Sequence, residues 1–255
     1  MTTPNLFNFA TSELSQDAFL CWLLSWADSK YAQKNKMLHQ VATHLIARIY
    51  QDAASPMPSV LSVNVKTQYK NMDILCLVND DTVIMIEDKV GTVEHSDQIR
   101  RYRAILEKDF PNHKLIFVYL QTGDQSHYKA VTKHGYIVIH RKDLLTILES
   151  PDGRDAQKTN NIIEDYALFL RKHEDRVNSY QHLPLDQWSS SSWIGFYKRL
   201  QNELRLGNWG YVPNQSGGFM CFYWSGCHKT DEHEVYLQLE EELSLIHISE
   251  PTRPY

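Results

Sequence analysis

Two apolar runs joined by a short polar turn constrain the fold of this chain more than any other feature. Met72–Val78 and Val83–Val90 are largely apolar, and the residues between them, Asn79-Asp80-Asp81, are typical of turns. The pattern predicts a β-hairpin in which Val78 faces Thr82. Because apolar residues occupy both faces of each run, we expect buried central strands and not a half-exposed edge.

The same register gathers three charged residues at one end of the hairpin. Asp73 is expected opposite Glu87, and directly opposed residues have Cβ atoms about 4.5–5.5 Å apart. Lys89 lies two residues beyond Glu87 and therefore points to the same face of the strand. Asp88 should face the other side of the sheet, so it is left out of the predicted site.

Two opposed carboxylates on a buried strand are unfavourable unless a cation lies beside them. Mg²⁺ prefers oxygen ligands and is commonly held by one or two carboxylates together with a substrate phosphate. A lysine such as Lys89 beside that metal can orient a water molecule and stabilise charge on a phosphate. The alternative interpretation is a surface hairpin with a Glu87–Lys89 pair and Asp73 near its solvated end.

The composition is that of an ordinary globular protein. The chain has 255 residues, of which 42% are hydrophobic and 22% are charged, so it can form one large domain or two. No segment approaches the ~20 apolar residues of a membrane span. The N-terminus has no basic region before an apolar one, and we expect a cytoplasmic protein without membrane contact.

The formal net charge of −5 argues against a protein that coats DNA non-specifically, because such affinity comes from Lys and Arg on phosphates. A local basic channel remains compatible with this charge. Two groups of residues are candidates for it, with a solvated face as the alternative for each: Arg100, Arg101 and Arg103; His140, Arg141 and Lys142.

The order of predicted elements is helix, helix, three strands, helix, strand, strand and helix. This order predicts an α/β fold with a mixed central sheet flanked by helices. The predicted helices are Thr11–Asp28, Leu38–Tyr50, Ser96–Phe110 and Asn160–Glu174; the predicted strands are Val60–Gln68, Met72–Val78, Val83–Val90, Lys114–Gln121 and Tyr136–His140.

The composition changes beyond residue 178. After a linker at residues 187–192, a helical pattern covers residues 193–204, and two strand patterns cover Gly217–Trp224 and Glu234–Leu239. We therefore expect a core over residues 1–178 and a small α+β appendage over 179–243. Its aromatic residues are candidates for base stacking, although a core role is commoner. Ser244–Tyr255 continues no pattern and resembles a translated sequencing adapter, so a non-native tail and a truncated appendage are expected.

Asp73 and Ile86-Glu87-Asp88-Lys89 together resemble the signature of the PD-(D/E)XK nuclease superfamily, with Glu87-x-Lys89 as its ExK element. The proline that often precedes the aspartate is absent here, as it is in many members. The segments 9–19 and 193–197 resemble an uncharacterised bacterial branch of the superfamily. Gln98-Ile99-Arg100-Arg101-Tyr102 is similar to a Gln-x-x-x-Tyr motif of recombination and phage exonucleases.

The resemblance implies a restriction-endonuclease-like core and a metal-dependent nuclease that hydrolyses DNA, in phage defence or DNA processing. Asp73 and Glu87 would bind Mg²⁺, or Mn²⁺ in its place, and Lys89 would act on the attacking water. Glu13 would supplement the metal site from the first helix; the alternative for Glu13 is compensation of the helix N-terminus. Gln98 and Tyr102, at i and i+4 on one helix face, would contact water, phosphate or DNA; the alternative is a buried Tyr with an exposed Gln.

Two other functions remain open at this point. The first is a catalytically inactive module of the same fold that binds nucleic acid or protein, since a fold alone does not guarantee activity. The second is a toxin-like or defence nuclease that acts with a protein partner through the aromatic C-terminal region. The sequence does not distinguish DNA from RNA, or exonuclease from endonuclease action.

Overall fold

The computed structural model describes residues 4–91, 98–215, 217–229 and 234–241. The chain divides into two compact units. Unit 1 consists of Met1–Gly123 and Tyr128–Lys172, and unit 2 of Asp124–His127 and His173–Tyr255. The predicted tail at 244–255 lies outside the described residues, and the predicted boundary at residue 178 stays a prediction.

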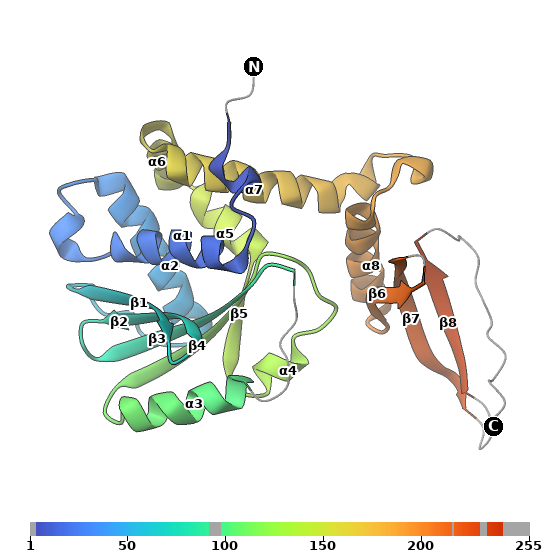
Figure 1. Cartoon of the computed structure of the whole chain (residues 1–255), viewed down its shortest axis with the longest axis horizontal. Coiled ribbons are helices and arrows are strands. Elements are labelled where there is room, and N and C mark those ends of the chain that lie inside the picture. Colours follow the sequence, from blue (N-terminus) through green and yellow to red (C-terminus); the bar gives the residue numbers. More distant parts are fainter. Residues whose placement is uncertain (1–3, 92–97, 216, 230–233, 242–255) are drawn as a thin grey trace. The chain divides into compact units, whose positions relative to one another are not determined.

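Unit 1 is built on a five-stranded mixed sheet with the strand order β1-β2-β3-β4-β5 (Figure 1). The pairs β1–β2 and β2–β3 are antiparallel, whereas β3–β4 and β4–β5 are parallel. The strands are β1 (Val63–Tyr69), β2 (Met72–Val78), β3 (Thr82–Lys89), β4 (Lys114–Gln121) and β5 (Tyr136–His140). The sheet and its flanking helices confirm the predicted α/β fold of restriction-endonuclease-like architecture.

The hairpin of β2 and β3 has the predicted register, with Val78 paired to Thr82 and Ile74 to Ile86. Asn79 and Asp80 have φ angles of 52° and 55°, the left-handed conformation that matches the turn to the twist of the strands. Every residue of β3 is buried. The next step of the register beyond Ile74 brings Asp73 beside Glu87.

Five helices cover one face of the sheet and form the larger hydrophobic core with the side chains of Ile74, Ile84 and Ile86. Ser12 caps the first of them by accepting a hydrogen bond from Ser15 N. These helices are α1 (Glu13–Ser25), α2 (Lys36–Asp52), α5 (Arg141–Leu148), α6 (Pro151–Thr159) and the unit 1 part of α7 (Asn161–Asn178).

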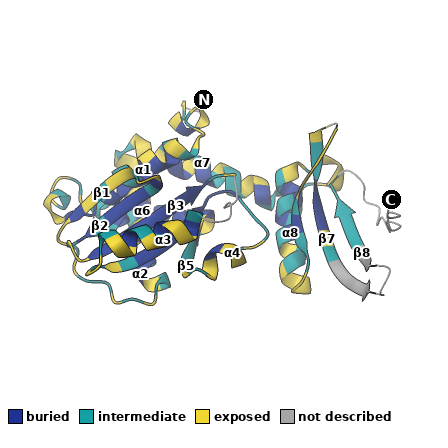
Figure 2. Cartoon of the chain, turned by 60° about the horizontal axis from the view of Figure 1, so that its bottom comes forward, coloured by how far each residue is buried: buried dark blue, intermediate teal, exposed yellow. Residues whose placement is uncertain are grey.

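The opposite face of the sheet carries α3 (Gln98–Asp109) and α4 (Lys129–Thr132), and has its own core. Ile99, Tyr102 and Leu106 of α3 are buried there, and the outer side of the helix is exposed (Figure 2). The central strands are therefore covered on both faces, which explains why their sequences are apolar throughout.

The sequence did not predict α5 and α6. Pro151 occupies the first turn of α6, where its missing N–H costs nothing. The Ser150 side chain caps this helix by accepting a hydrogen bond from Gly153 N.

Unit 2 contains a helix and a three-stranded antiparallel sheet of order β6-β7-β8, which confirms the predicted α+β appendage. Five aromatic and sulfur-containing side chains are buried in its core: Trp193, Tyr197, Trp209, Met220 and Phe222. These aromatic residues therefore have the core role. The elements are α8 (Ser190–Leu204), β6 (Asn208–Asn214), which the sequence did not predict, β7 (Gly217–Lys229) and β8 (Glu234–Glu240).

Four short 3₁₀ turns complete the described structure: Leu6–Asn8, Ser29–Tyr31, Ser179–Gln181 and Leu185–Gln187. Within the described residues, no helix combines the length and the apolar character that a membrane span requires.

Candidate active site

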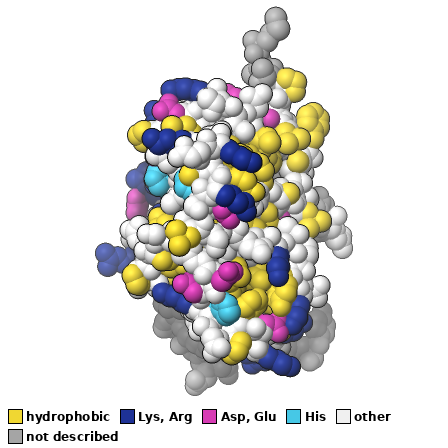
Figure 3. All heavy atoms as spheres, turned by 90° about the vertical axis from the view of Figure 1, so that its left-hand side faces the viewer, with side chains coloured by type: hydrophobic (Ala, Val, Ile, Leu, Met, Phe, Trp, Pro, Cys, Tyr) yellow, Lys and Arg dark blue, Asp and Glu magenta, His cyan; other side chains and the backbone are white. Residues whose placement is uncertain are grey.

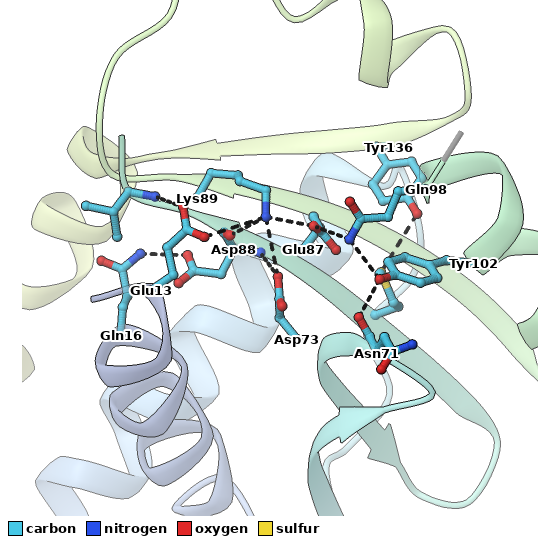
Figure 4. Close-up of polar contacts among 12 residues, drawn as sticks. Glu13, Gln16, Asn71, Asp73, Glu87, Asp88, Lys89, Gln98, Tyr102 and Tyr136 are labelled. Carbon is cyan, nitrogen blue, oxygen red and sulfur yellow. Dashed lines mark hydrogen bonds and ion pairs between the residues drawn. The ribbon is translucent and has the colours of Figure 1, made fainter. Parts of the chain in front are cut away.

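Lys89 lies at the centre of a group of three carboxylates at the C-terminal end of β3 (Figure 4). Its Nζ atom is 2.7 Å from Glu87 Oε1, 3.8 Å from Asp73 Oδ2 and 3.9 Å from Glu13 Oε2. It also donates a hydrogen bond of 3.0 Å to the Asp88 carbonyl oxygen. The structure thus brings together the lysine and all three predicted metal ligands, which come from α1, β2 and β3.

Backbone amides of β3 and the residue after it fix two of these carboxylates. Asp88 N donates to Asp73 Oδ2 at 2.9 Å, and Val90 N donates to Glu13 Oε1 at 3.1 Å. Hydrogen bonds from amides to carboxylates are among the stronger ones in proteins. The hydrogen bond from Val90 therefore holds the Glu13 carboxylate of α1 at the end of β3.

Helix α3 adds the two residues of the Gln-x-x-x-Tyr motif. Gln98 Nε2 lies 3.1 Å from Glu87 Oε1 and 2.7 Å from the Tyr102 hydroxyl oxygen. The Tyr102 hydroxyl donates to the carbonyl oxygen of Asn71. Lys70 and Asn71 have φ angles of 51° and 68°, and this left-handed turn between β1 and β2 presents that carbonyl to Tyr102. The alternative interpretation expected a buried Tyr102 and an exposed Gln98. Tyr102 is buried, but Gln98 contacts Glu87.

Burial determines the protonation behaviour of the group. Glu87 is fully buried, and the loss of hydration, followed by the charge of Asp73, raises its pKa to about 7. Burial is also the main reason that the pKa of Asp73 is raised. Burial acts to lower the pKa of Lys89, but Glu87 and the other carboxylates outweigh it and raise that pKa. Lys89 therefore remains an ammonium ion.

These residues fit a divalent cation by the chemistry of their donors. Glu87 Oε2 is buried and has no hydrogen-bond partner among the described residues, and the single ammonium group of Lys89 is shared by three carboxylates. Across the described part of the chain, no three His, Cys, Asp or Glu residues stand in a ready metal-binding arrangement. Lys89 occupies the space between the carboxylates, so binding a cation requires the lysine side chain to shift.

A second polar cluster lies behind the site, on the α1 side of the sheet. Gln16 Nε2 donates to Asp88 Oδ1 at 2.6 Å, and the Asp17 carboxyl group interacts with the same side chain. Burial, followed by the charge of Asp73, raises the pKa of Asp17 to about 7; burial also raises the pKa of Asp88. Asp88 faces this cluster and Glu87 faces α3, which agrees with the predicted alternation.

Sequence reasoning missed Gln16. It allowed either Glu13 or Asp17, which share one face of the first helix, to point at the end of the hairpin, and assigned only Glu13 to the site. The signal was present in the spacing of Glu13, Gln16 and Asp17, which places three polar residues on one side of a largely apolar helix. Both Gln16 and Asp17 are buried, with 4% and 3% of their surfaces exposed. Buried polar groups of this kind are expected to have specific partners.

Two of the arginines predicted as candidates for a basic channel have other roles. Arg141 is buried and donates to the carbonyl oxygen of Thr122 at 2.5 Å, so it holds the end of β4 in place. Arg103 stacks 3.9 Å from the centre of the Phe117 ring and donates to the His134 carbonyl oxygen. Both arginines are structural because their guanidinium groups are committed to neighbouring groups of the protein.

Arg100 and Arg101, in contrast, are exposed on α3. On the side of the molecule drawn in Figure 3, Lys and Arg side chains are scattered among acidic and apolar ones. This distribution is consistent with the net charge of −5.

A family model described as the PD-(D/E)XK nuclease superfamily matches residues 4–183. The chain belongs to the PD-(D/E)XK nuclease superfamily. No curated protein and no solved structure matches it. The match covers unit 1 and includes every residue of the site in Figure 4. Members of the PD-(D/E)XK superfamily are generally nucleases or other phosphodiesterases that use divalent metals, and nucleic acid is the substrate class that membership implies.

Proposed function

We propose that this protein is a Mg²⁺-dependent deoxyribonuclease that hydrolyses phosphodiester bonds, with Mn²⁺ as an alternative metal. The observation that carries the proposal is the position of Lys89 among Asp73, Glu87 and Glu13 at the buried end of β3. A lysine and two or three carboxylates at one point are the groups that metal-assisted hydrolysis of a phosphate ester needs.

In this proposal Asp73 and Glu87 hold the metal ion, and Glu13 supplements them from α1. The backbone carbonyl of Asp88, which points into the same space, is a further candidate ligand. A bound divalent cation supplies charge neutralisation and lowers the pKa of a coordinated water. Glu87 Oε2 supports this assignment because it is a buried acceptor that meets no donor among the residues that the structure describes.

Lys89 is assigned to orient the attacking water and to stabilise negative charge on the phosphate. Its raised pKa supports the second role, since the ammonium form persists at neutral pH. Only 8% of Lys89 is exposed, so its charge acts where little water screens it. A divalent cation held by these carboxylates would compete with Lys89, which now lies 2.7 Å from Glu87, and would leave the ammonium group available to the substrate phosphate.

Gln98 is assigned to hold the Glu87 carboxylate in its orientation, and Tyr102 to hold Gln98. The chain of contacts from Asn71 through Tyr102 and Gln98 to Glu87 supports this assignment. Hydrogen bonds to metal-binding carboxylates fix their geometry and commonly change metal affinity or activity by about 10–100-fold. Arg100 and Arg101, exposed on the same helix, are candidates for contacts with the phosphate backbone.

The biological setting belongs to the same proposal. The resemblance to a bacterial branch supports a cytoplasmic role in phage defence or DNA processing, and a protein partner is proposed to act through the C-terminal region. The alternative function is an inactive module that binds nucleic acid or protein through the same fold.

A cleavage panel tests the proposal. Purified protein is incubated in Mg²⁺ or Mn²⁺ with linear and circular DNA, each single- and double-stranded, and with RNA, beside a Lys89→Met variant. We expect metal-dependent cleavage of DNA by the wild type and its loss in the variant. Cleavage of linear but not circular DNA would assign exonuclease action. Salt-sensitive binding without cleavage in either metal would overturn the proposal in favour of the inactive module.

A further inference from the structure

We propose that Gln16 is a positioning residue that holds the Glu13 carboxylate at the metal site, and so sets the affinity for the divalent cation. This inference rests on the proposed function, because it assumes that Glu13 contributes to metal binding. Gln16 itself lies on the other side of β3 from Glu87 and acts through its neighbours (Figure 4).

The Gln16 amide joins α1 to three other elements. Its nitrogen donates to Asp88 Oδ1 of β3 at 2.6 Å. Its oxygen accepts hydrogen bonds from Thr122 Oγ1, just after β4, at 2.9 Å and from the Tyr166 hydroxyl of α7 at 3.1 Å. Thr122 and Tyr166 are buried, so no solvent competes for these bonds.

These contacts need an amide at this position. Asp88 Oδ1 requires a donor, whereas the hydroxyls of Thr122 and Tyr166 require an acceptor. A glutamate would place a second carboxyl group against Asp88, and an apolar side chain would remove a hydrogen-bond partner from three buried polar groups. Glutamine is the residue of this length that satisfies both requirements.

The link to the metal site runs through Asp88 and through α1. The Asp88 side chain binds Gln16 on one face of the sheet, while its amide binds Asp73 and its carbonyl accepts from Lys89 on the other. One turn before Gln16 on the same helix, Glu13 binds Val90 N. The Gln16–Asp88 bond therefore fixes the register of α1 against β3, and this register places Glu13 beside Lys89.

A double-mutant cycle measured as Mn²⁺ binding by isothermal titration calorimetry tests the inference without depending on cleavage. We expect Gln16→Met and Glu13→Gln each to weaken Mn²⁺ binding by about 10–100-fold, the usual effect of residues that orient metal ligands. The double variant should bind as weakly as Glu13→Gln alone, because Gln16 acts through Glu13. Gln51→Met, a substitution on the exposed end of α2, should bind Mn²⁺ like the wild type.

Two gentler variants keep the test valid if Gln16→Met does not fold. Thr122→Val and Tyr166→Phe each remove one hydroxyl that donates to the Gln16 oxygen and leave its bond to Asp88 intact. Each should weaken Mn²⁺ binding by a few-fold. When combined with Glu13→Gln, neither should weaken Mn²⁺ binding further.

Additive effects of the Gln16 and Glu13 substitutions, or unchanged Mn²⁺ binding in Gln16→Met, would overturn the positioning role. Additive losses would instead mark a general effect on the fold. A wild-type protein without a saturable Mn²⁺ site would overturn the metal assignment itself, so failure of this inference is distinguishable from failure of the proposed function.

Discussion

Glu87, Asp88 and Lys89 are three consecutive ionisable residues, and all three are buried in a strand. Burial of a charge is costly unless a partner lies within contact distance. Strand alternation provides the partners by sending Glu87 and Lys89 to the α3 side and Asp88 to the α1 side. The site therefore consists of two polar clusters on opposite faces of one strand, joined by its backbone.

Asp17 gives this arrangement a measurable pH dependence. Burial raises the pKa of its carboxyl group from 3.8 to about 7. Between these values the folded protein binds more protons than the unfolded chain, so a rise in pH favours unfolding. We expect the free energy of unfolding of metal-free protein, measured with urea, to decrease from about pH 4 to about pH 7.

Asp17→Asn removes one of the groups responsible, and should make this decrease smaller. The pKa of Glu87 is also raised, so part of the decrease in the free energy of unfolding will remain in this variant. Asp155→Asn is the matched control, because the Asp155 side chain is 54% exposed. An Asp17→Asn variant with the pH dependence of the wild type would contradict this account.

The residues of the site differ in how far the sequence could predict them. Asp73, Glu87 and Lys89 follow from strand alternation and one hairpin turn, which are local properties. The partners of Gln16 are 72, 106 and 150 positions away, and no periodicity connects such distant residues. Their association depends on how α1, β4 and α7 pack, which a single sequence does not specify.

At the scale of elements, the parallel strands β3 and β4 end side by side below the site. Thr122 N donates to the carbonyl oxygen of Lys89 at 3.0 Å, so the chain after β4 runs directly against the chain after β3. A Cβ atom on Gly123 would lie 1.8 Å from the carbonyl oxygen of Val90. This close approach explains the glycine in a turn that the sequence predicted only as the end of a strand.

Gly123→Ala should displace Val90, whose amide holds Glu13. We expect the free energy of unfolding to fall by about 1–3 kcal/mol, the usual cost of an overpacked site. Cleavage activity should fall with it, because the Glu13 contact is disturbed.

Gly91→Ala provides the control, since no heavy atom of the described residues lies within 4 Å of a Cβ atom at that position. Its free energy of unfolding should stay within about 0.5 kcal/mol of the wild type. Equal stability of the two variants in urea unfolding would show that the approach of Gly123 to Val90 is unimportant.

The length of the apolar pattern explains which helices were predicted. The helices α1 and α2 have long apolar faces and were predicted within a few residues of their observed bounds. In contrast, α5 and α6 have eight and nine residues, and depend on capping by neighbouring side chains more than on a long periodic pattern. Short helices of this kind give a weak signal in the sequence.

At the scale of the molecule, the two units have separate hydrophobic cores. Unit 2 depends on a close approach of its own helix, because a Cβ atom on Gly195 of α8 would lie 1.8 Å from the carbonyl oxygen of Val177. Tyr197, on the same helix, is buried and donates to the carbonyl oxygen of Leu239 at 2.9 Å.

Gly195→Ala should therefore destabilise unit 2 by about 1–3 kcal/mol through overpacking. Hydrogen exchange followed by mass spectrometry should show faster exchange in peptides of α8 and β7, and unchanged protection of β2 and β3. Gly210→Ala, where a Cβ atom would meet no described residue within 4 Å, should leave both patterns unchanged. Faster exchange in β3 of Gly195→Ala would contradict separate cores.

The measurement that tests the central claim most directly is the Mg²⁺-dependent DNA cleavage rate of Asp73→Asn and Glu87→Gln. Both substitutions keep the size of the side chain and remove its charge, and circular dichroism establishes that the variants are folded. Glu107→Gln is the control, because the Glu107 side chain is 58% exposed on α3. We predict cleavage by the wild type and Glu107→Gln, and its loss in the other two. Retained metal-dependent cleavage in both Asp73→Asn and Glu87→Gln would contradict the proposed active site.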